Sequence, residues 1–126
     1  MKKIISTSKA PAPIGPYNQA ILSGDTLYVS GQIPIDPNTG QLVKGDIFKE
    51  THQSMKNLAA ILDEAGMNFE NVVKTSIFLK DMHQFKQVNE AYASYFNADT
   101  APARETVEVA NLPKFVNVEI SMIAVK

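Results

Sequence analysis

The segment that most constrains the fold is residues 115–125, because it alternates like a strand yet carries apolar side chains on both faces. Successive side chains of a strand point to opposite sides of a sheet, so each side of this one needs cover. One side presents Val116, Val118, Ile120, Met122 and Ala124, and the other presents Phe115, Ile123 and Val125. The chain must therefore cover, at least in part, both faces of a sheet.

The other periodicities predict an α+β fold. Alternation and turn signals predict five further strands, at 2–6, 20–23, 26–32, 71–80 and 104–109. In the strand at 71–80, Val73, Thr75, Ile77 and Leu79 are expected to share one face. With helices between the third, fourth and fifth strands, the order is βββαβαββ. A chain of 126 residues is expected to form a single domain, 1–126.

Two segments have the periodicity of amphipathic helices. The first, at about 47–65, ends at Gly66, and its stripe is Ile47, Thr51, Met55, Leu58, Leu62 and Ala65. The second follows Asp81, a suitable N-cap, and its stripe is Phe85, Val88, Tyr92 and Phe96. Two helices can cover only one face of a sheet of about six strands. A second copy of the chain is the simplest cover for the other face, which predicts a homo-oligomer.

Composition excludes several classes of site and partner. The chain has no cysteine, which excludes disulfides, thiolate nucleophiles and cysteine-ligated metals. The two histidines, His52 and His83, are far apart in sequence and are expected to be exposed helix residues rather than metal ligands. A net charge of −1 gives no electrostatic footprint for nucleic acid or for a membrane surface. No apolar run follows Met1, Lys2 and Lys3, so a cytoplasmic protein is expected.

Two charged residues stand where they could act on a substrate. Arg104 opens a strand just after a proline, and its planar guanidinium suits a bidentate grip on a carboxylate. The alternative is a surface arginine paired with Glu105 or Glu108. Glu119 lies mid-strand, and burial against a partner chain would raise the pKa of its carboxyl and prepare it for proton transfer. The alternative is a strand glutamate that faces solvent.

Three uncharged positions are weaker candidates. Tyr17 follows Gly15 and Pro16 in a rigid loop that could present a phenol, or it could simply pack that loop onto the core. Gly31 would let a ligand or another strand approach the backbone closely. Asn89 borders the apolar stripe of the second helix, where an exposed amide is the simpler interpretation.

Several ordered segments together resemble the Rid (YjgF-type) family of reactive-intermediate deaminases. They run along essentially the whole chain: APIGPY at 12–17, VSGQIPIDP at 29–37, VKTSIFLKD at 73–81, VN at 88–89, PAR at 102–104, VEVA at 107–110 and VEI at 118–120. The resemblance implies a chorismate-mutase-like α+β fold in a trimeric barrel with active sites between subunits. It also implies cofactor-independent hydrolysis of 2-aminoacrylate, 2-aminocrotonate and their imine tautomers, a 2-iminobutanoate/2-iminopropanoate deaminase activity.

The resemblance also assigns roles to residues of this chain. It implies that Arg104 binds the substrate carboxylate and that Glu119 positions or activates water. Tyr17, Gly31, Asn89 and Thr106 would line the pocket. Two departures affect this expectation. Glu105-Thr106 stands where Ser-Cys is common in the family, and Ser121 stands where relatives often have a second glutamate. The residues at 105 and 106 make the preferred substrate less certain. Ser121 makes the charge around Glu119 less certain.

Two other functions are compatible with the same residues. A non-catalytic module could use the arginine pocket to hold a small carboxylate such as a keto acid and report it to a partner. An RNA-acting translation inhibitor, suggested for relatives, is disfavoured because no basic, aromatic-rich stripe is present. The sequence therefore favours the deaminase.

Overall fold

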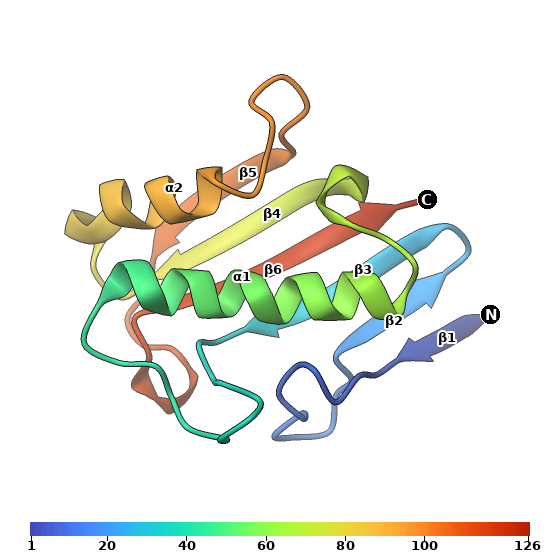
Figure 1. The fold of residues 1–126 in the computed structure, drawn as a ribbon, viewed down its shortest axis with the longest axis horizontal. Coiled ribbons are helices and arrows are strands. Elements are labelled where there is room, and N and C mark those ends of the chain that lie inside the picture. The colour runs from blue at the N-terminus through green and yellow to red at the C-terminus, as the bar shows by residue number, and fades with distance from the viewer.

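A computed structural model describes residues 1–126 of the chain, and it has the predicted order of elements (Figure 1). The strands are β1 (Lys2–Ile5), β2 (Ala20–Ser23), β3 (Thr26–Gln32), β4 (Val72–Leu79), β5 (Ala103–Glu108) and β6 (Val118–Val125). The helices are α1 (Ile47–Glu64) and α2 (Phe85–Ala93), with short 3-10 turns η1 (Phe69–Asn71), η2 (Met82–Gln84) and η3 (Pro113–Phe115). The α+β prediction is confirmed.

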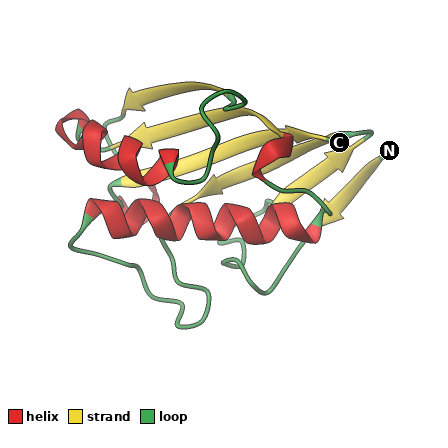
Figure 2. Ribbon diagram, turned by 45° about the horizontal axis from the view of Figure 1, so that its top comes forward, coloured by secondary structure: helices red, strands yellow, loops and turns green.

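All six strands form one mixed sheet in the order β1-β2-β3-β6-β4-β5. Every pair is antiparallel except β4 with β5, which run parallel. Parallel neighbours need a long crossover, and α2 lies on the crossover between these two strands. Both helices lie on the same face of the sheet, as Figure 2 shows. The predicted helix-free face is confirmed; it is called the open face below.

The ends of α1 follow from its sequence. The carboxylate of Asp46 accepts hydrogen bonds from the backbone N–H groups of Phe48 and Lys49, which satisfies donors that the first turn leaves free. After Glu64 the chain reverses through Gly66, whose φ of +73° suits a residue without Cβ. The predicted helix at 47–65 is thus confirmed to within one residue.

The second helix begins later than Asp81 suggests. Asp81 caps η2 by accepting from the N–H of His83, and α2 follows directly from Phe85. Phe96, predicted on the helix stripe, lies beyond the last helical residue Ala93 but still packs against the core. Val88 and Tyr92 are buried as predicted.

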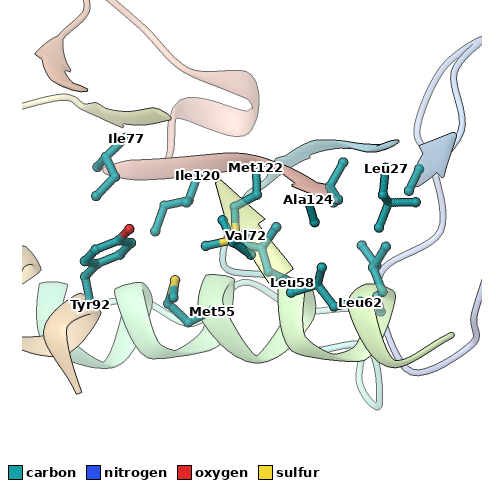
Figure 3. Close-up of a cluster of buried hydrophobic side chains, with 14 of the residues drawn as sticks. Leu27, Met55, Leu58, Leu62, Val72, Ile77, Tyr92, Ile120, Met122 and Ala124 are labelled. Carbon is teal, nitrogen blue, oxygen red and sulfur yellow. The ribbon is translucent and has the colours of Figure 1, made fainter. Parts of the chain in front are cut away.

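The core lies between the two helices and the helix-covered face of the sheet. Figure 3 shows Met55 and Leu58 of α1 beneath Ile120 and Met122 of β6. Leu58 and Ile120 are fully buried, and each such side chain contributes about 1.5–3 kcal/mol when removed from water. These residues belong to a cluster of 21 buried hydrophobic side chains, large enough to fix the positions of the strands that carry the site.

Two strands depart from the predicted alternation. In β4 the register with β6 shifts between Val72 and Lys74, so Val73 is an extra residue. Val72 is buried like Thr75, whereas Val73 is 49% exposed, so Val73, contrary to the prediction, does not share the face of Thr75. β6 begins at Val118 rather than at residue 115, because Lys114 and Phe115 have φ of 55°, outside the strand region.

Candidate functional site

Arg104 lies on β5, the edge strand beside β4, and its side chain turns to the helix-covered face. It pairs in register with Thr75, which is fully buried against α2. Its Nη1 donates a hydrogen bond of 2.8 Å to Oδ1 of Asn89. Its Cζ lies 5.0 Å from the ring centre of Tyr92 and 5.7 Å from that of Phe85. The alternative of a surface pair with Glu105 or Glu108 is thereby excluded for this chain.

Thr106 lies two residues farther along β5 and pairs in register with the buried Ile77, so it shares the face of Arg104. Its hydroxyl oxygen is buried and has no hydrogen-bond partner. This hydroxyl therefore makes no internal hydrogen bond on the face that it shares with Arg104. Arg104, Asn89 and Thr106 thus form one polar group of residues, which we call the arginine half-site.

Glu119 lies on β6 and points to the open face, where it pairs in register with Phe78 of β4. Its carboxyl is half-buried, and burial raises the pKa of Glu119 above the usual value for glutamate. A Cβ built on Gly31 would come within 2.8 Å of Cδ of Glu119. The close approach expected at Gly31 is therefore made by a carboxylate from the neighbouring strand, and glycine is needed there for that reason.

A cavity of about 350 Å³ opens beside this carboxylate. Its lining residues are Ile14, Tyr17, Ser30, Gly31, Ile33, Pro113 and Glu119. The hydroxyl oxygen of Tyr17 accepts a hydrogen bond of 3.3 Å from the N–H of Ile14, and the Tyr17 side chain is 46% exposed. Tyr17 therefore lines a cavity rather than packing its loop into the core. Tyr17, Gly31 and Glu119, with the cavity, are called the carboxylate half-site.

The two half-sites lie on opposite faces of the sheet within one protomer. Pairing in register places Arg104 beside Thr75 on the helix side, and Glu119 beside Phe78 on the open side. The residues that the sequence singled out thus separate into two groups. One substrate cannot meet both groups on a single copy of the chain.

The residue beside Arg104 points away from it, as alternation predicts. Glu105 forms an ion pair of 2.6 Å with Lys74 on the open face and also accepts a hydrogen bond from Ser76. These two hydrogen bonds, that of Lys74 first, lower the pKa of Glu105. The change from the common family residue at 105 therefore does not touch the arginine half-site.

Sequence reasoning missed two contacts of Arg104. Phe85 and Tyr92 were assigned only to the apolar stripe of the second helix, yet both rings contact the guanidinium. The available signal was the spacing of Phe85, Asn89 and Tyr92 at i, i+4 and i+7, which places all three on one face of a helix.

No three His, Asp or Glu side chains of the chain gather in a group that could hold a metal ion. His83 is exposed as predicted and contacts Asp81. His52 is only partly exposed, contrary to prediction, because its Nδ1 shares a hydrogen bond of 2.7 Å with the hydroxyl of Tyr95.

Neither α1 nor α2 has the length and the apolar composition that a membrane-spanning helix needs.

Comparison with known proteins gives consistent matches over the whole chain. The model of the family described as Endoribonuclease L-PSP matches residues 7–126. A RutC family protein of Pyrococcus horikoshii is 52% identical over 126 residues, covering 100% of this chain and 99% of the relative. The 2-iminobutanoate/2-iminopropanoate deaminase of Mus musculus is 51% identical over 126 residues, covering 100% of this chain and 93% of the relative.

A solved structure agrees with these matches. A protein of the Rid family from Yersinia pestis, 50% identical, superposes with a TM-score of 0.97 and covers 100% of both chains. Strands β2 to β6, the two helices and the segments carrying both half-sites lie within residues 7–126, the region that the family model matches. The chain therefore belongs to the endoribonuclease L-PSP family, the family of YjgF and the Rid proteins.

Proposed function

We propose that the chain is a 2-iminobutanoate/2-iminopropanoate deaminase, which hydrolyses imino acids to 2-keto acids and ammonia without a cofactor. The observation that carries the proposal is the presence of two specialised groups in one chain: a guanidinium held by α2 with donors left free, and a half-buried carboxyl with a raised pKa. Relatives at about half identity that bear this activity in their names support the same assignment.

The arginine half-site supplies recognition. Asn89 occupies one N–H of Nη1, and no other hydrogen bond reaches the guanidinium. The remaining donors keep the fork geometry that fits a carboxylate with two parallel hydrogen bonds. Fixing the carboxylate also fixes the adjacent imine carbon, which lowers the orientational cost of attack by water.

The carboxylate half-site supplies proton transfer. Water adds to the carbon of the protonated imine, and Glu119 takes a proton from that water to give a carbinolamine. The protonated carboxyl then gives this proton to the carbinolamine nitrogen. As the C–N bond breaks, the carbinolamine hydroxyl loses its proton to the Glu119 carboxylate and becomes the carbonyl, and ammonia and the 2-keto acid leave. A carboxyl with a raised pKa exchanges protons near neutral pH more readily than an ordinary one, and such acid–base help contributes about 10²–10⁴ in rate.

The geometry of the two half-sites favours a site between subunits. Since they face away from each other in one protomer, a substrate that uses both needs Arg104 of one copy and Glu119 of another. A closed assembly of copies repeats such a contact between subunits, and it can also cover the open face. The resemblance to the Rid family supplies the number of copies, and we propose a homotrimer whose active sites are shared by neighbouring copies.

The decisive experiment couples a threonine dehydratase to this protein and follows the appearance of 2-ketobutyrate. The proposal expects formation faster than the spontaneous rate, and Arg104→Ala should abolish the acceleration while the oligomer persists. Binding of 2-ketobutyrate without acceleration would support the keto acid-binding module instead. Cleavage of RNA that survives in Arg104→Ala would point to a nuclease and away from this site.

A further inference from the structure

The guanidinium of Arg104 sits in an aromatic cradle made by one face of α2. Phe85, Asn89 and Tyr92 follow one another at i, i+4 and i+7, so all three side chains reach the same point over β5. The two ring centres lie 5.7 Å and 5.0 Å from Cζ of Arg104, within the range of cation–π attraction. Asn89 adds the single directional hydrogen bond.

The ring of Tyr92 is itself anchored to the sheet. Its hydroxyl donates a hydrogen bond of 3.0 Å to Oγ1 of Thr75, and both groups are buried. Figure 3 shows that the Tyr92 side chain extends from α2 toward the sheet, with its hydroxyl oxygen nearest the sheet. Burial raises the pKa of Tyr92, so the phenol remains protonated and continues to donate at neutral pH. Thr75 is also the register partner of Arg104, so the sheet fixes the arginine backbone and the supporting ring together.

Phe85 also contacts the guanidinium of Arg104 but differs from Tyr92 in exposure. Its side chain is 38% exposed, whereas Tyr92 is 5% exposed. An aromatic ring left partly in water at the start of a helix contributes little to the core. The contact with the guanidinium instead indicates that the Phe85 ring supports Arg104. Two aromatic rings can hold a cation without using any of the N–H donors of the guanidinium.

We propose that Phe85 and Tyr92 are positioning residues, which hold the Arg104 guanidinium so that its free donors meet a substrate carboxylate. The proposal rests on the proposed function for the identity of the substrate, but the cradle itself can be tested without turnover. Neither residue touches the substrate in this account; both act through Arg104.

The test uses Phe85→Leu, which removes the exposed ring while keeping an apolar side chain. Binding of 2-ketobutyrate, measured by calorimetry, should weaken by about 2- to 30-fold, the range that loss of a cation–π contact gives. In the coupled assay KM should rise by a similar factor and kcat should stay within about twofold, because the lost contact serves binding. Phe85→Tyr keeps a ring and should restore binding to within about twofold.

The matched control is Phe48→Leu. Phe48 is 41% exposed, lies on α1 and contacts His52, whereas the rings that contact Arg104 are Phe85 and Tyr92. It should leave binding and KM unchanged. A loss in Phe48→Leu equal to that in Phe85→Leu would assign the effect to general loss of surface aromatic area and would overturn the proposal.

A spectroscopic measurement separates the cradle from the activity. The Nε–H signal of Arg104, identified by its disappearance in Arg104→Lys, should carry ring-current shifts that change in Phe85→Leu and persist in Phe48→Leu. If the wild-type protein neither turns over the imine nor binds 2-ketobutyrate, the proposed function fails and this signal alone decides the cradle. An unchanged signal in Phe85→Leu, or unchanged binding in an active protein, would reject the positioning role.

Discussion

Arg104 and Glu119 occupy opposite faces of one sheet, on strands that both neighbour β4. This separation gives a direct test of the shared site. Neither Arg104→Ala nor Glu119→Gln should be active alone. When the two variants are unfolded together and refolded, some interfaces should join an intact Arg104 to an intact Glu119. For random cyclic assembly from equal amounts, about a quarter of the sites are intact, so about a quarter of wild-type activity should return.

The coupled assay on the refolded mixture checks this expectation. Refolding each variant separately before mixing, without exchange of subunits, is the control and should stay inactive. A mixture that never regains activity, although mixed oligomers form, would mean that both residues serve one protomer or that one of them is not required.

Glu119→Gln tests proton transfer at nearly constant size. Turnover in the dehydratase-coupled assay should fall by at least about 100-fold, since the amide cannot accept the proton of water. Binding of 2-ketobutyrate should change little, because the carboxylate contact belongs to Arg104. Wild-type turnover in this variant would leave Glu119 with a structural role only.

The raised pKa of Glu119 also predicts how stability depends on pH. Between the usual value of 4.5 and the raised one, the folded state binds more protons than the unfolded state. Stability from this group is therefore present below 4.5 and is lost as pH rises through the pKa of the folded state. Glu119→Gln should melt above wild type at neutral pH, and the difference should vanish in acid.

The dependence of stability on pH should have the opposite sign for Glu105, which serves as the comparison. Hydrogen bonds from Lys74 and Ser76 lower the pKa of Glu105, so its contribution is present above 4.5 and is lost as pH falls. Glu105→Gln should melt below wild type at neutral pH and converge with it in acid. Thermal unfolding of both variants across the same pH series checks the two signs, and identical trends would refute the assignment for Glu119.

Gly31→Ala tests the close approach of the carboxylate. The new methyl group would lie 2.8 Å from Cδ of Glu119, so the carboxyl must turn away. Because Glu119 is only half-buried, stability should change by less than about 1 kcal/mol. Turnover should nevertheless fall by up to about 100-fold, as a displacement of about 1 Å at a reacting group can cause. Adding Gly31→Ala to Glu119→Gln should cause no further loss.

The sequence predicted those features that depend on local pattern. Alternation and periodicity located β2, β3 and α1 almost to the residue, because the side chains that face the core repeat at fixed spacing. The sequence also predicted the open face, because two helices can cover only one face of a sheet of about six strands. Arg104, Glu119, Tyr17, Gly31 and Asn89 were candidates from their residue types and settings, and the resemblance assigned their roles and added Thr106. The structure shows on which face of the sheet the two half-sites lie.

Features that depend on pairing between strands could not be predicted. The extra residue Val73 is defined only by the register of β4 with β6, so local alternation placed it on the wrong face. The faces of Arg104 and Glu119 likewise follow from partners distant in sequence. The aromatic cradle required knowing that α2 lies over β5, which periodicity within the helix cannot reveal.

The open face and the free edge of β5 have a practical consequence for handling the protein. An isolated copy would present apolar side chains such as Tyr28 and Ile123, beside a strand whose outer backbone groups lack partners. Dilution that separates the copies of the proposed homotrimer should therefore inactivate the protein and expose a surface prone to aggregation. Specific activity should therefore depend on protein concentration. Storage at high concentration should preserve the activity of the protein for longer.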